Sequence, residues 1–228
     1  MFQSVLNLFF PKACAGCNAI LITSEIVICT ECRHNIALTN HHNIPNNEAF
    51  LKFYGKINVV HASALFYFQK RGIVQELIHK LKYKGHQEIG ETIGFWYAEE
   101  LKNTTALHDV DFIIPVPLHP KKLKKRGYNQ VATFGKALSQ ELNVPVKELI
   151  LVRDKNTITQ TKKNILDRSE AVSHIFSAAF NADFYNKHFL LIDDVITTGA
   201  TLESCGRELL KIPGARLSIV CMAMSKSQ

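Results

Sequence analysis

The sequence predicts an α/β protein: an open parallel sheet with a small metal-binding module at its N-terminus. Two segments predict the sheet, because residues 110–116 are apolar except for Asp111, residues 189–192 are wholly apolar, and each segment is followed by a polar loop and an amphipathic helical pattern. Two Cys-x-x-Cys pairs within residues 14–32 predict the metal module. We expect a short helix, the module and a linker to occupy residues 1–50, and the sheet domain to occupy residues 51–228.

Size and charge place few limits on the function. The chain of 228 residues can bury a sizeable core, and 46% hydrophobic with 21% charged residues is ordinary for a globular protein. A formal net charge of +7 suits a phosphate-rich ligand or a nucleic acid and does not decide between them. No segment approaches the ~18 consecutive apolar residues of a membrane span. Residues 1–10 lack the basic start and cleavage site of a signal peptide, so we expect a short docking helix there and a cytoplasmic protein.

The first chemical motif is a set of four cysteines in two pairs. Each Cys-x-x-Cys pair can form a tight turn that directs two thiolates at one point, so two pairs can surround one ion tetrahedrally. In a reducing compartment metal binding is favoured over disulfides, and four protein ligands are typical of a structural zinc site. Iron, or a degenerate or redox-active site, is the alternative. The expected ligands are Cys14, Cys17, Cys29 and Cys32.

Residues 33–58 are polar and rich in asparagine and histidine, which indicates a linker. His34, His41 and His42 could replace a cysteine as metal ligands, but we expect all three to lie in surface loop. Cys205 and Cys221 fall within apolar patterns further along the chain, so we expect them to be small core residues.

The sheet domain is expected to begin with a strand at residues 59–68, followed by two helices. Apolar residues recur on one helical face from Ile73 to Leu81, and lysines followed by Gly85 end this helix. The second helix has an inward face that runs from Ile89 to Leu101.

Residues 110–116 form the next expected strand, and a strongly basic loop follows it. Pro117 and Pro120 restrict this loop, and Asn129 is expected to cap the helix after it. The residue types alone are equally consistent with an anion site, a solvated turn and a nucleic-acid contact. The polar and basic residues of the loop are His119, Lys121, Lys122, Lys124, Lys125 and Arg126.

The next strand–loop–helix unit carries the most specific motif. Asp193 and Asp194 follow the apolar segment, and Thr197-Thr198-Gly199-Ala200-Thr201 leads into a helix. Free N–H groups, the helix dipole and threonine hydroxyls suit a phosphate, and Gly199 allows the backbone to approach it. The acids suit sugar hydroxyls or a divalent cation instead. The simpler alternative is that the threonines only cap the helix. A last apolar strand is expected at residues 217–223.

This order of acids and threonines resembles the phosphoribosyl-pyrophosphate (PRPP) loop of type I phosphoribosyltransferases. Together with the cysteine pairs and the run from Pro-Val-Pro-Leu-His-Pro to Arg-Gly-Tyr-Asn-Gln at residues 115–130, it resembles the ComF family, which includes competence proteins of the ComFC type and GntX proteins. The resemblance covers essentially the whole chain. It implies a type I phosphoribosyltransferase fold with an N-terminal zinc-ribbon-like module, and a link to the uptake of transforming DNA.

The resemblance also implies roles for residues. The acids would hold the ribose hydroxyls at the catalytic centre, the loop would bind the 5′-phosphate, and the basic run would bind pyrophosphate. Mg²⁺ would accompany PRPP, held largely by ligand oxygens and water. Thr157, Gln160 and Arg168 match the ComF pattern in a flexible-loop region, but Ala171 replaces the expected asparagine, which puts any role of that amide in doubt. The implied PRPP-binding residues are Asp193, Asp194, Val195, Thr197, Thr198, Gly199, Ala200 and Thr201.

Two functional hypotheses follow. The first is a PRPP-binding, Mg-dependent phosphoribosyltransferase-like protein; cationic groups would neutralise the departing pyrophosphate. No general base stands out, so the sequence does not identify the acceptor. The second is a non-catalytic competence protein that binds single-stranded DNA or the DNA-uptake machinery. Single-strand binders interleave exposed aromatic and basic residues, and Tyr128 alone accompanies the basic run, which favours the first hypothesis.

Overall fold

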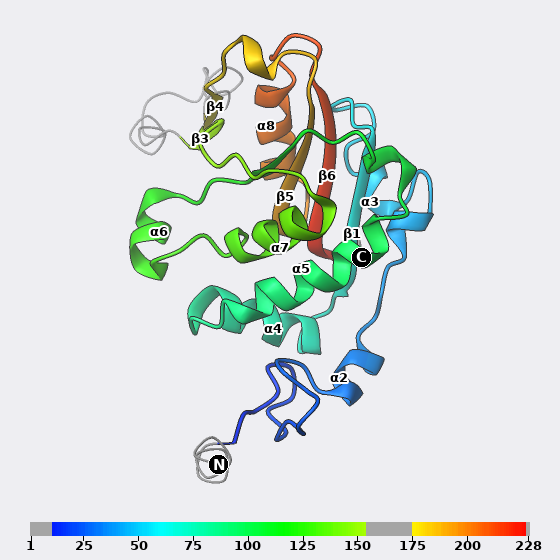
Figure 1. Ribbon diagram of the computed structural model, residues 1–228, viewed down its shortest axis with the longest axis vertical. Coiled ribbons are helices and arrows are strands. Elements are labelled where there is room, and N and C mark those ends of the chain that lie inside the picture. Colours follow the sequence, from blue (N-terminus) through cyan, green and yellow to red (C-terminus); the bar gives the residue numbers. More distant parts are fainter. Residues whose placement is uncertain (1–10, 154–174, 227–228) are drawn as a thin grey trace, which may run out of the picture.

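The computed structural model describes residues 11–153 and 175–226, and a four-stranded parallel sheet forms the centre of this part of the chain (Figure 1). A short parallel bridge between Ile113 and Val146 extends the sheet beyond its last strand. The strands, in the spatial order β1–β6–β5–β2, are β1 (His61–Phe68), β6 (Arg216–Ser225), β5 (His188–Ile196) and β2 (Phe112–Pro115). A separate antiparallel pair consists of β3 (Leu151–Arg153) and β4 (Phe176–Ala178).

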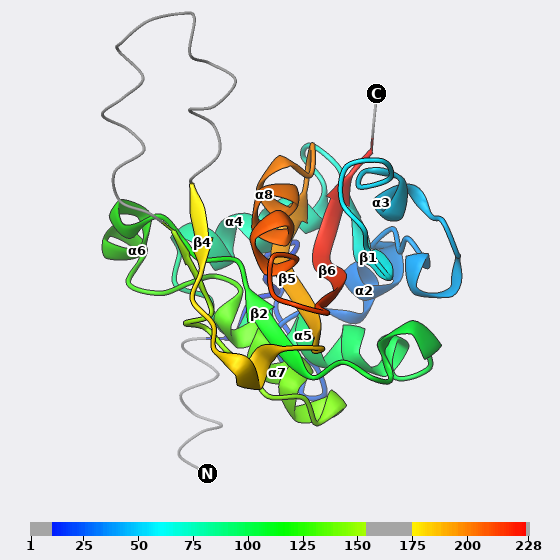
Figure 2. The same ribbon diagram turned by 90° about the horizontal axis from the view of Figure 1, so that it is seen from above.

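Helices cover both faces of the sheet (Figures 1 and 2). On one face lie α4 (Ile73–Tyr83), α5 (Glu88–Leu101) and α7 (Ala132–Leu142), and on the other lies α8 (Ala200–Leu209). The shorter elements are α2 (Thr30–Asn35), α3 (Glu48–Leu51), α6 (Pro120–Arg126) and the 3₁₀ turns η1 (His41–Asn43), η2 (Thr105–Leu107) and η4 (Ala182–Phe184). Among the described residues, no helix is both long enough and apolar enough to cross a membrane.

The strand β5 shows why its sequence is apolar throughout. Leu190 and Ile192 belong to the core beneath α4, α5 and α7, whereas Phe189 and Leu191 belong to the core beneath α8. Successive side chains of a strand point to opposite faces, so a strand covered on both faces must be apolar at every position. Asp193 and Asp194 end this apolar run, and they lie toward the carboxyl end of the parallel sheet.

The predicted α/β class with a parallel sheet and an N-terminal cysteine cluster is confirmed. The helix predicted to begin at Ile73 begins there, and the next helix spans Glu88–Leu101. Cys205 and Cys221 are both fully buried, as expected for core residues. The helix expected near the N-terminus, at residues 1–10, lies outside the described residues.

The basic run is a helix, α6, so the prediction of a loop was wrong. Proline is favoured at the first position of a helix because its φ angle is already helical, and lysine and arginine are good helix formers. His119 caps the helix by accepting the Lys121 N–H on Nδ1 at 3.1 Å. Gly127, with a φ angle of 81°, ends it.

Asn129 does not cap the next helix, because α7 begins at Ala132 and Val131 holds the capping position. The Asn129 side chain instead donates from Nδ2 to the Val116 carbonyl at 3.0 Å and accepts the Val131 N–H at 3.3 Å. It therefore fastens the segment before α7 to the end of β2.

Residues 33–58 do not form a free linker, because much of this segment packs along β1. The Thr39 N–H donates to the Leu65 carbonyl at 3.0 Å, and the Tyr67 N–H donates to the Ala37 carbonyl at 2.9 Å. The Asn47 side chain adds a bond from Nδ2 to the Ala62 carbonyl at 2.9 Å. These contacts place η1 and α3 beside β1.

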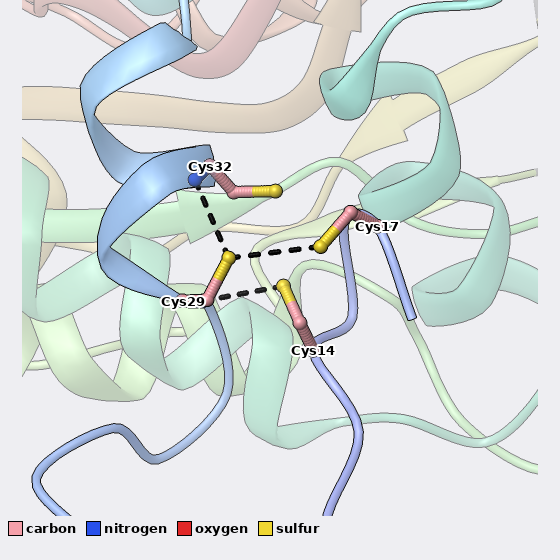
Figure 3. A group of neighbouring side chains, drawn as sticks. All are labelled: Cys14, Cys17, Cys29 and Cys32. Carbon is pink, nitrogen blue, oxygen red and sulfur yellow. Dashed lines mark hydrogen bonds between the residues drawn. The ribbon is translucent and has the colours of Figure 1, made fainter. Parts of the chain in front are cut away.

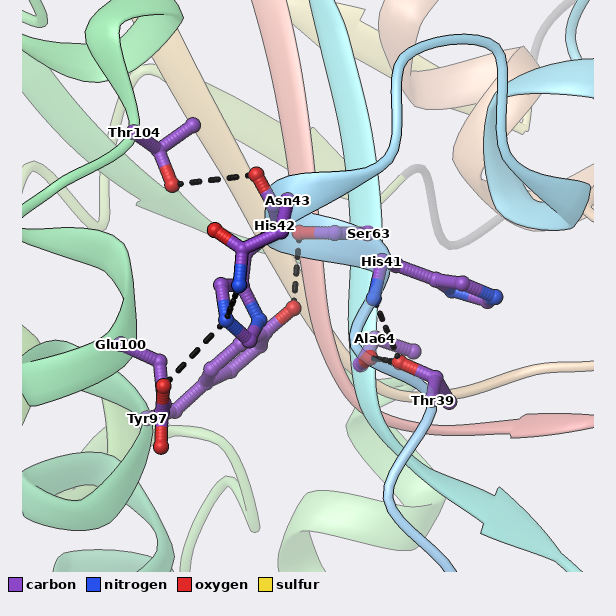
Figure 4. Close-up of polar contacts among 9 residues, drawn as sticks. All are labelled: Thr39, His41, His42, Asn43, Ser63, Ala64, Tyr97, Glu100 and Thr104. Atoms are coloured by element: carbon purple, nitrogen blue, oxygen red, sulfur yellow. Dashed lines mark hydrogen bonds and ion pairs between the residues drawn. The ribbon is translucent and has the colours of Figure 1, made fainter.

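The prediction of surface loop was wrong for all three histidines: His34 is exposed but lies in the helix α2, and His41 and His42 are buried, at 2% and 9% exposed. Figure 4 shows His42 beside Tyr97 and Glu100 of α5, with its Nε2 atom 3.2 Å from the Glu100 carboxylate. Neither ring nitrogen of His41 has a hydrogen-bond partner within the described part of the chain. The sequence pattern missed this burial because asparagine-rich composition indicates a loop but does not say where the loop packs.

Candidate functional site

The acids and the threonine loop form one site, which we name the acid–threonine loop (residues 193–201). A hollow at this place is lined by Asp193, Val195 and residues 197–202. Gly199 adopts a left-handed conformation with a φ angle of 83° and immediately precedes α8. Glycine has no side chain to cap the helix, and among the described residues one weak side-chain contact reaches its first turn, from the Ala200 N–H to Thr198 Oγ1 at 3.4 Å. The site can therefore accept an anion at the positive end of α8.

The aromatic ring of Phe53 supports the turn at Gly199. Phe53 is fully buried and lies after α3. A Cβ atom placed on Gly199 would lie 3.2 Å from Cε1 of this ring. The segment after α3 thus packs against the turn that borders the hollow. The sequence reasoning missed this role of Phe53, since nothing local to residues 48–53 indicates the contact.

Asp193 is the acid that faces the hollow. Its Oδ1 atom accepts the backbone N–H of Asp194 at 2.8 Å. Burial of the carboxyl group and, second, the neighbouring charge of Asp194 raise the pKa of Asp193 to about 7, against the opposing effects of the Asp194 N–H and of the charges of Lys82 and Lys122. Near neutral pH this carboxyl group can therefore exist in either protonation state.

Asp194 turns away from the hollow toward α4. Its Oδ1 atom lies 2.8 Å from Nζ of Lys82, and the two side chains are 7% and 22% exposed. The Oδ2 atom of Asp194 is buried and has no hydrogen-bond partner among the described residues. The sequence reasoning treated Lys82 only as favourable charge at the end of a helix. Its position four residues after buried Ile78 was the available signal that it faces inward.

The four lysines of α6 are not all brought to the acid–threonine loop. Lys121, Lys122, Lys124 and Lys125 are exposed, and every residue of α6 is exposed or half-buried. Figures 1 and 2 show α6 at the side of the molecule, away from the centre of the sheet. Lys122 is the α6 lysine whose charge acts on the Asp193 carboxyl group. The position of His119 as the helix cap gives it a structural role.

Arg126 and Tyr128 bind the end of α4 instead of an open pocket. The Arg126 guanidinium group lies 4.9 Å from the ring centre of Tyr83, donates to the Tyr83 hydroxyl at 3.3 Å and also donates to Gln130 Oε1. The Tyr128 hydroxyl donates to the Leu81 carbonyl. The Arg-Gly-Tyr-Asn-Gln motif thus connects α6 to the last turn of α4.

The four N-terminal cysteines converge at a second, separate site. Their sulfur atoms all lie within 4.8 Å of one another, and Figure 3 shows Cys29 and Cys32 at the start of α2 facing Cys14 and Cys17. Among the described residues, this is the group of histidine, cysteine and acidic side chains that could hold a metal ion. Cys14 Sγ accepts the Gly16 N–H at 3.3 Å and the Cys29 N–H at 3.2 Å. Burial opposes ionisation of Cys14, but these backbone hydrogen bonds lower its pKa to about 6.

Such N–H···S contacts favour thiolates, which are the form that binds a metal. Because the four sulfur atoms lie within 4.8 Å of one another, they fit a closed, four-coordinate ion such as zinc. A metal ion at this site would have a structural role, because four thiolate ligands leave no coordination position open for a substrate.

The turn that carries the first two cysteines packs against α4. A Cβ atom on Gly16 would lie 2.8 Å from Ile73 Cγ2 and 2.9 Å from Cys32 Sγ, so glycine is required there. Lys80 Nζ donates to Asn18 Oδ1 at 2.6 Å. One face of α4 thus holds the cysteine module, while Lys82 reaches the acid–threonine loop. The flexible-loop candidates Thr157, Gln160 and Arg168 lie outside the described residues.

Comparison with known sequences finds a phosphoribosyl transferase domain and relatives that are named as competence or DNA utilization proteins. Residues 131–228 match the model of the phosphoribosyl transferase domain. Competence protein F of Haemophilus influenzae is 34% identical over 140 residues, which cover 60% of this chain and 61% of that protein. The DNA utilization protein YhgH of Escherichia coli K12 is 28% identical over 149 residues, covering 64% and 65%. Competence protein ComFC of Bacillus subtilis is 26% identical over 140 residues, covering 61% and 54%. The chain thus spans less than two thirds of the length of each of these relatives.

Solved structures show a looser similarity. A glutamine PRPP amidotransferase from B. subtilis aligns with 62% of this chain and 30% of its own at 15% identity and a TM-score of 0.43. A purine phosphoribosyltransferase from Pyrococcus horikoshii aligns with 58% of this chain and 72% of its own at 24% identity and a TM-score of 0.36.

Proposed function

We propose that the chain, which resembles competence proteins of the ComF type and carries a match to the phosphoribosyl transferase domain, binds PRPP at the acid–threonine loop and transfers the phosphoribosyl group in a Mg-dependent reaction. The observation that carries the proposal is the shared hollow of Asp193, the threonines and the start of α8. A phosphate fits the helix end and the threonine hydroxyls, and a carboxylate beside it fits a sugar hydroxyl. A 5-phosphorylated ribose has both groups in one molecule.

Each group in the site has a proposed role. Thr197, Thr198 and Thr201, with the N–H groups around Gly199, would hold the 5′-phosphate. Asp193 would accept a hydrogen bond from a ribose hydroxyl, and the prediction that Asp194 holds a second hydroxyl is retained as part of the proposal. As the diphosphate leaves, positive charge develops on the ribose, and cations beside the acids would stabilise the departing group. Mg²⁺ would supply much of that charge through the phosphate oxygens. The acceptor of the phosphoribosyl group is not defined by any residue described above.

The cysteine module has a separate proposed role. Cys14, Cys17, Cys29 and Cys32 would bind structural zinc and keep the module folded against α4. A zinc ion there would leave the chemistry to the acid–threonine loop.

A second candidate function is binding of single-stranded DNA along α6. The names of the relatives, competence protein and DNA utilization protein, are consistent with it. The exposed lysines of α6 are the structural observation in its favour, because phosphate backbones bind to such charges. The two functions use different residues and can be tested separately.

The test uses two variants and two ligands. Asp193→Ala should abolish binding of PRPP while leaving the affinity for a single-stranded oligonucleotide unchanged. The double charge reversal Lys124→Glu/Lys125→Glu should weaken oligonucleotide binding and reduce its salt dependence, with Lys136→Glu on α7, also an exposed lysine, as the control. If Asp193→Ala leaves the affinity for PRPP unchanged, the assignment of the site is wrong.

A further inference from the structure

The last turn of α4 contacts both the acid–threonine loop and the segment around α6. Three consecutive residues fix it: the Leu81 carbonyl accepts from Tyr128, Lys82 pairs with Asp194, and the Tyr83 hydroxyl accepts from Arg126. Two of these contacts come from the segment around α6, and one comes from β5. Both chain neighbours of Lys82 are therefore held, one by its carbonyl and the other by its side chain, and the ion pair with Asp194 positions the ammonium group of Lys82.

The lysines near Lys82 have other environments. Lys80 is bonded to Asn18 of the cysteine module, and Lys84 is exposed beyond the end of the helix. Lys82 is the one of these three whose charge reaches the acids, since it pairs with Asp194 and also acts on Asp193. Its side chain is 22% exposed, compared with 7% for Asp194, so Lys82 is the more accessible partner of the pair.

An ammonium group has three N–H donors. Among the described residues, the ammonium group of Lys82 has one carboxylate partner, Asp194. The remaining donors can bond an oxygen of an anion without breaking the pair with Asp194. A dianionic or trianionic group beside two acids needs such a cation, because the acids would otherwise repel it. Lys122 of α6 is the other lysine whose charge acts on Asp193, so cations from two different elements act on this acid.

We propose that Lys82, anchored by Asp194, is a further anion-binding residue of this site and donates to the diphosphate of PRPP. The inference rests on the proposed function, because it takes the ligand from there. It gives Asp194 a definite task in the unliganded protein, which is to hold the ammonium group in place. It also explains why one acid faces the hollow while its neighbour faces α4.

The experiment compares two ligands that differ in the diphosphate. Calorimetric titrations with PRPP and with ribose 5-phosphate, both with Mg²⁺, are carried out on the wild type and on Lys82→Met. We expect Lys82→Met to lower the affinity for PRPP by about tenfold or more, as for loss of a hydrogen bond to a charged group. The affinity for ribose 5-phosphate should change by less than about twofold. Lys82→Arg should restore most of the PRPP affinity, and Lys84→Met should behave as the wild type.

Lys82→Met leaves the buried Asp194 carboxylate unpaired, which can destabilise the fold. The double variant Lys82→Met/Asp194→Asn removes both charges, and its ratio of PRPP to ribose 5-phosphate affinity should fall as in the single variant. Equal losses for both ligands would overturn the inference, because Lys82 would then act only through Asp194. Unchanged PRPP affinity in Lys82→Met would overturn it as well, with the proposed function intact. A wild type that binds neither ligand would refute the proposed function and this inference together.

Discussion

Substitution of Gly199 by alanine tests whether Phe53 positions the phosphate-binding turn. The φ angle of Gly199 is 83°, and a left-handed conformation costs an alanine about 1–2 kcal/mol. The new methyl group would also lie 3.2 Å from Cε1 of Phe53, closer than the optimal separation of about 3.5–4.0 Å. Phe53 is fully buried and cannot move freely, so overpacking adds a further cost of about 1–3 kcal/mol.

Substitutions at two other glycines separate the conformational cost from the overpacking cost. Gly55 and Gly85 have φ angles of 72° and 78°, and a Cβ atom at either position meets nothing within 4 Å. Alanine at these positions should therefore cost only the conformational part, about 1–2 kcal/mol in the free energy of unfolding. The assay is thermal or denaturant unfolding of the three variants, in which each kcal/mol lowers the Tm by about 2–4 °C for a chain of this size.

A double-mutant cycle completes this test. Phe53→Leu removes the edge of the ring, so combined with Gly199→Ala it should recover about 1 kcal/mol relative to the sum of the single changes. Gly199→Ala should also weaken PRPP binding, whereas Gly85→Ala should not. If Gly199→Ala is no more destabilising than Gly55→Ala and Gly85→Ala, and the cycle shows no coupling, the role assigned to Phe53 is wrong.

Three further predictions concern protonation and metal binding. Because the pKa of Asp193 is raised to about 7, PRPP affinity should rise about tenfold between pH 6 and pH 8 as the carboxyl group ionises; Asp193→Asn should show only the titration of the ligand, and equal profiles would contradict this. Burial lowers the pKa of His61 to about 4, with His42 and His41 contributing; the unfolded chain then binds more protons below pH 6.5, so stability should fall between pH 6.5 and 4 by at most on the order of 3 kcal/mol. His61→Gln should flatten this dependence in unfolding measurements, His34→Gln should not, and identical curves would refute the assignment. Cys14→Ser should abolish stoichiometric zinc, measured by elemental analysis, and lower the Tm, whereas Cys205→Ala should keep the metal; zinc retained in Cys14→Ser would exclude the four-cysteine site.

The sequence was sufficient to predict the features that depend on local patterns. The apolar segment before Asp193 predicted a doubly covered strand, and the spacing of the four cysteines predicted their convergence. The burial of His41 and His42 could not be predicted, because it depends on the packing of η1 against β1 and α5. The helix α6 was missed because proline and a run of like charges suggest a loop, whereas the capping residues His119 and Gly127 decide the outcome.

The split between the two acids is the feature of the site that sequence reasoning could least provide. Adjacent acids in a strand point in different directions, but the partner of each depends on what covers each face. Lys82 lies more than a hundred residues before Asp194 in the chain, and only the packing of α4 brings the two together. Among the α6 lysines, Lys122 is the one whose charge lowers the pKa of Asp193, and this too depends on packing between distant parts of the chain.

The most direct test of the central claim is calorimetric titration of the zinc-loaded wild type with PRPP, in the presence and absence of Mg²⁺. The proposed site predicts saturable one-to-one binding that strengthens with Mg²⁺, because the metal offsets the charge of the diphosphate beside Asp193 and Asp194. Absence of binding at millimolar PRPP, with the protein folded and its zinc in place, would contradict the claim that the acid–threonine loop is a PRPP site.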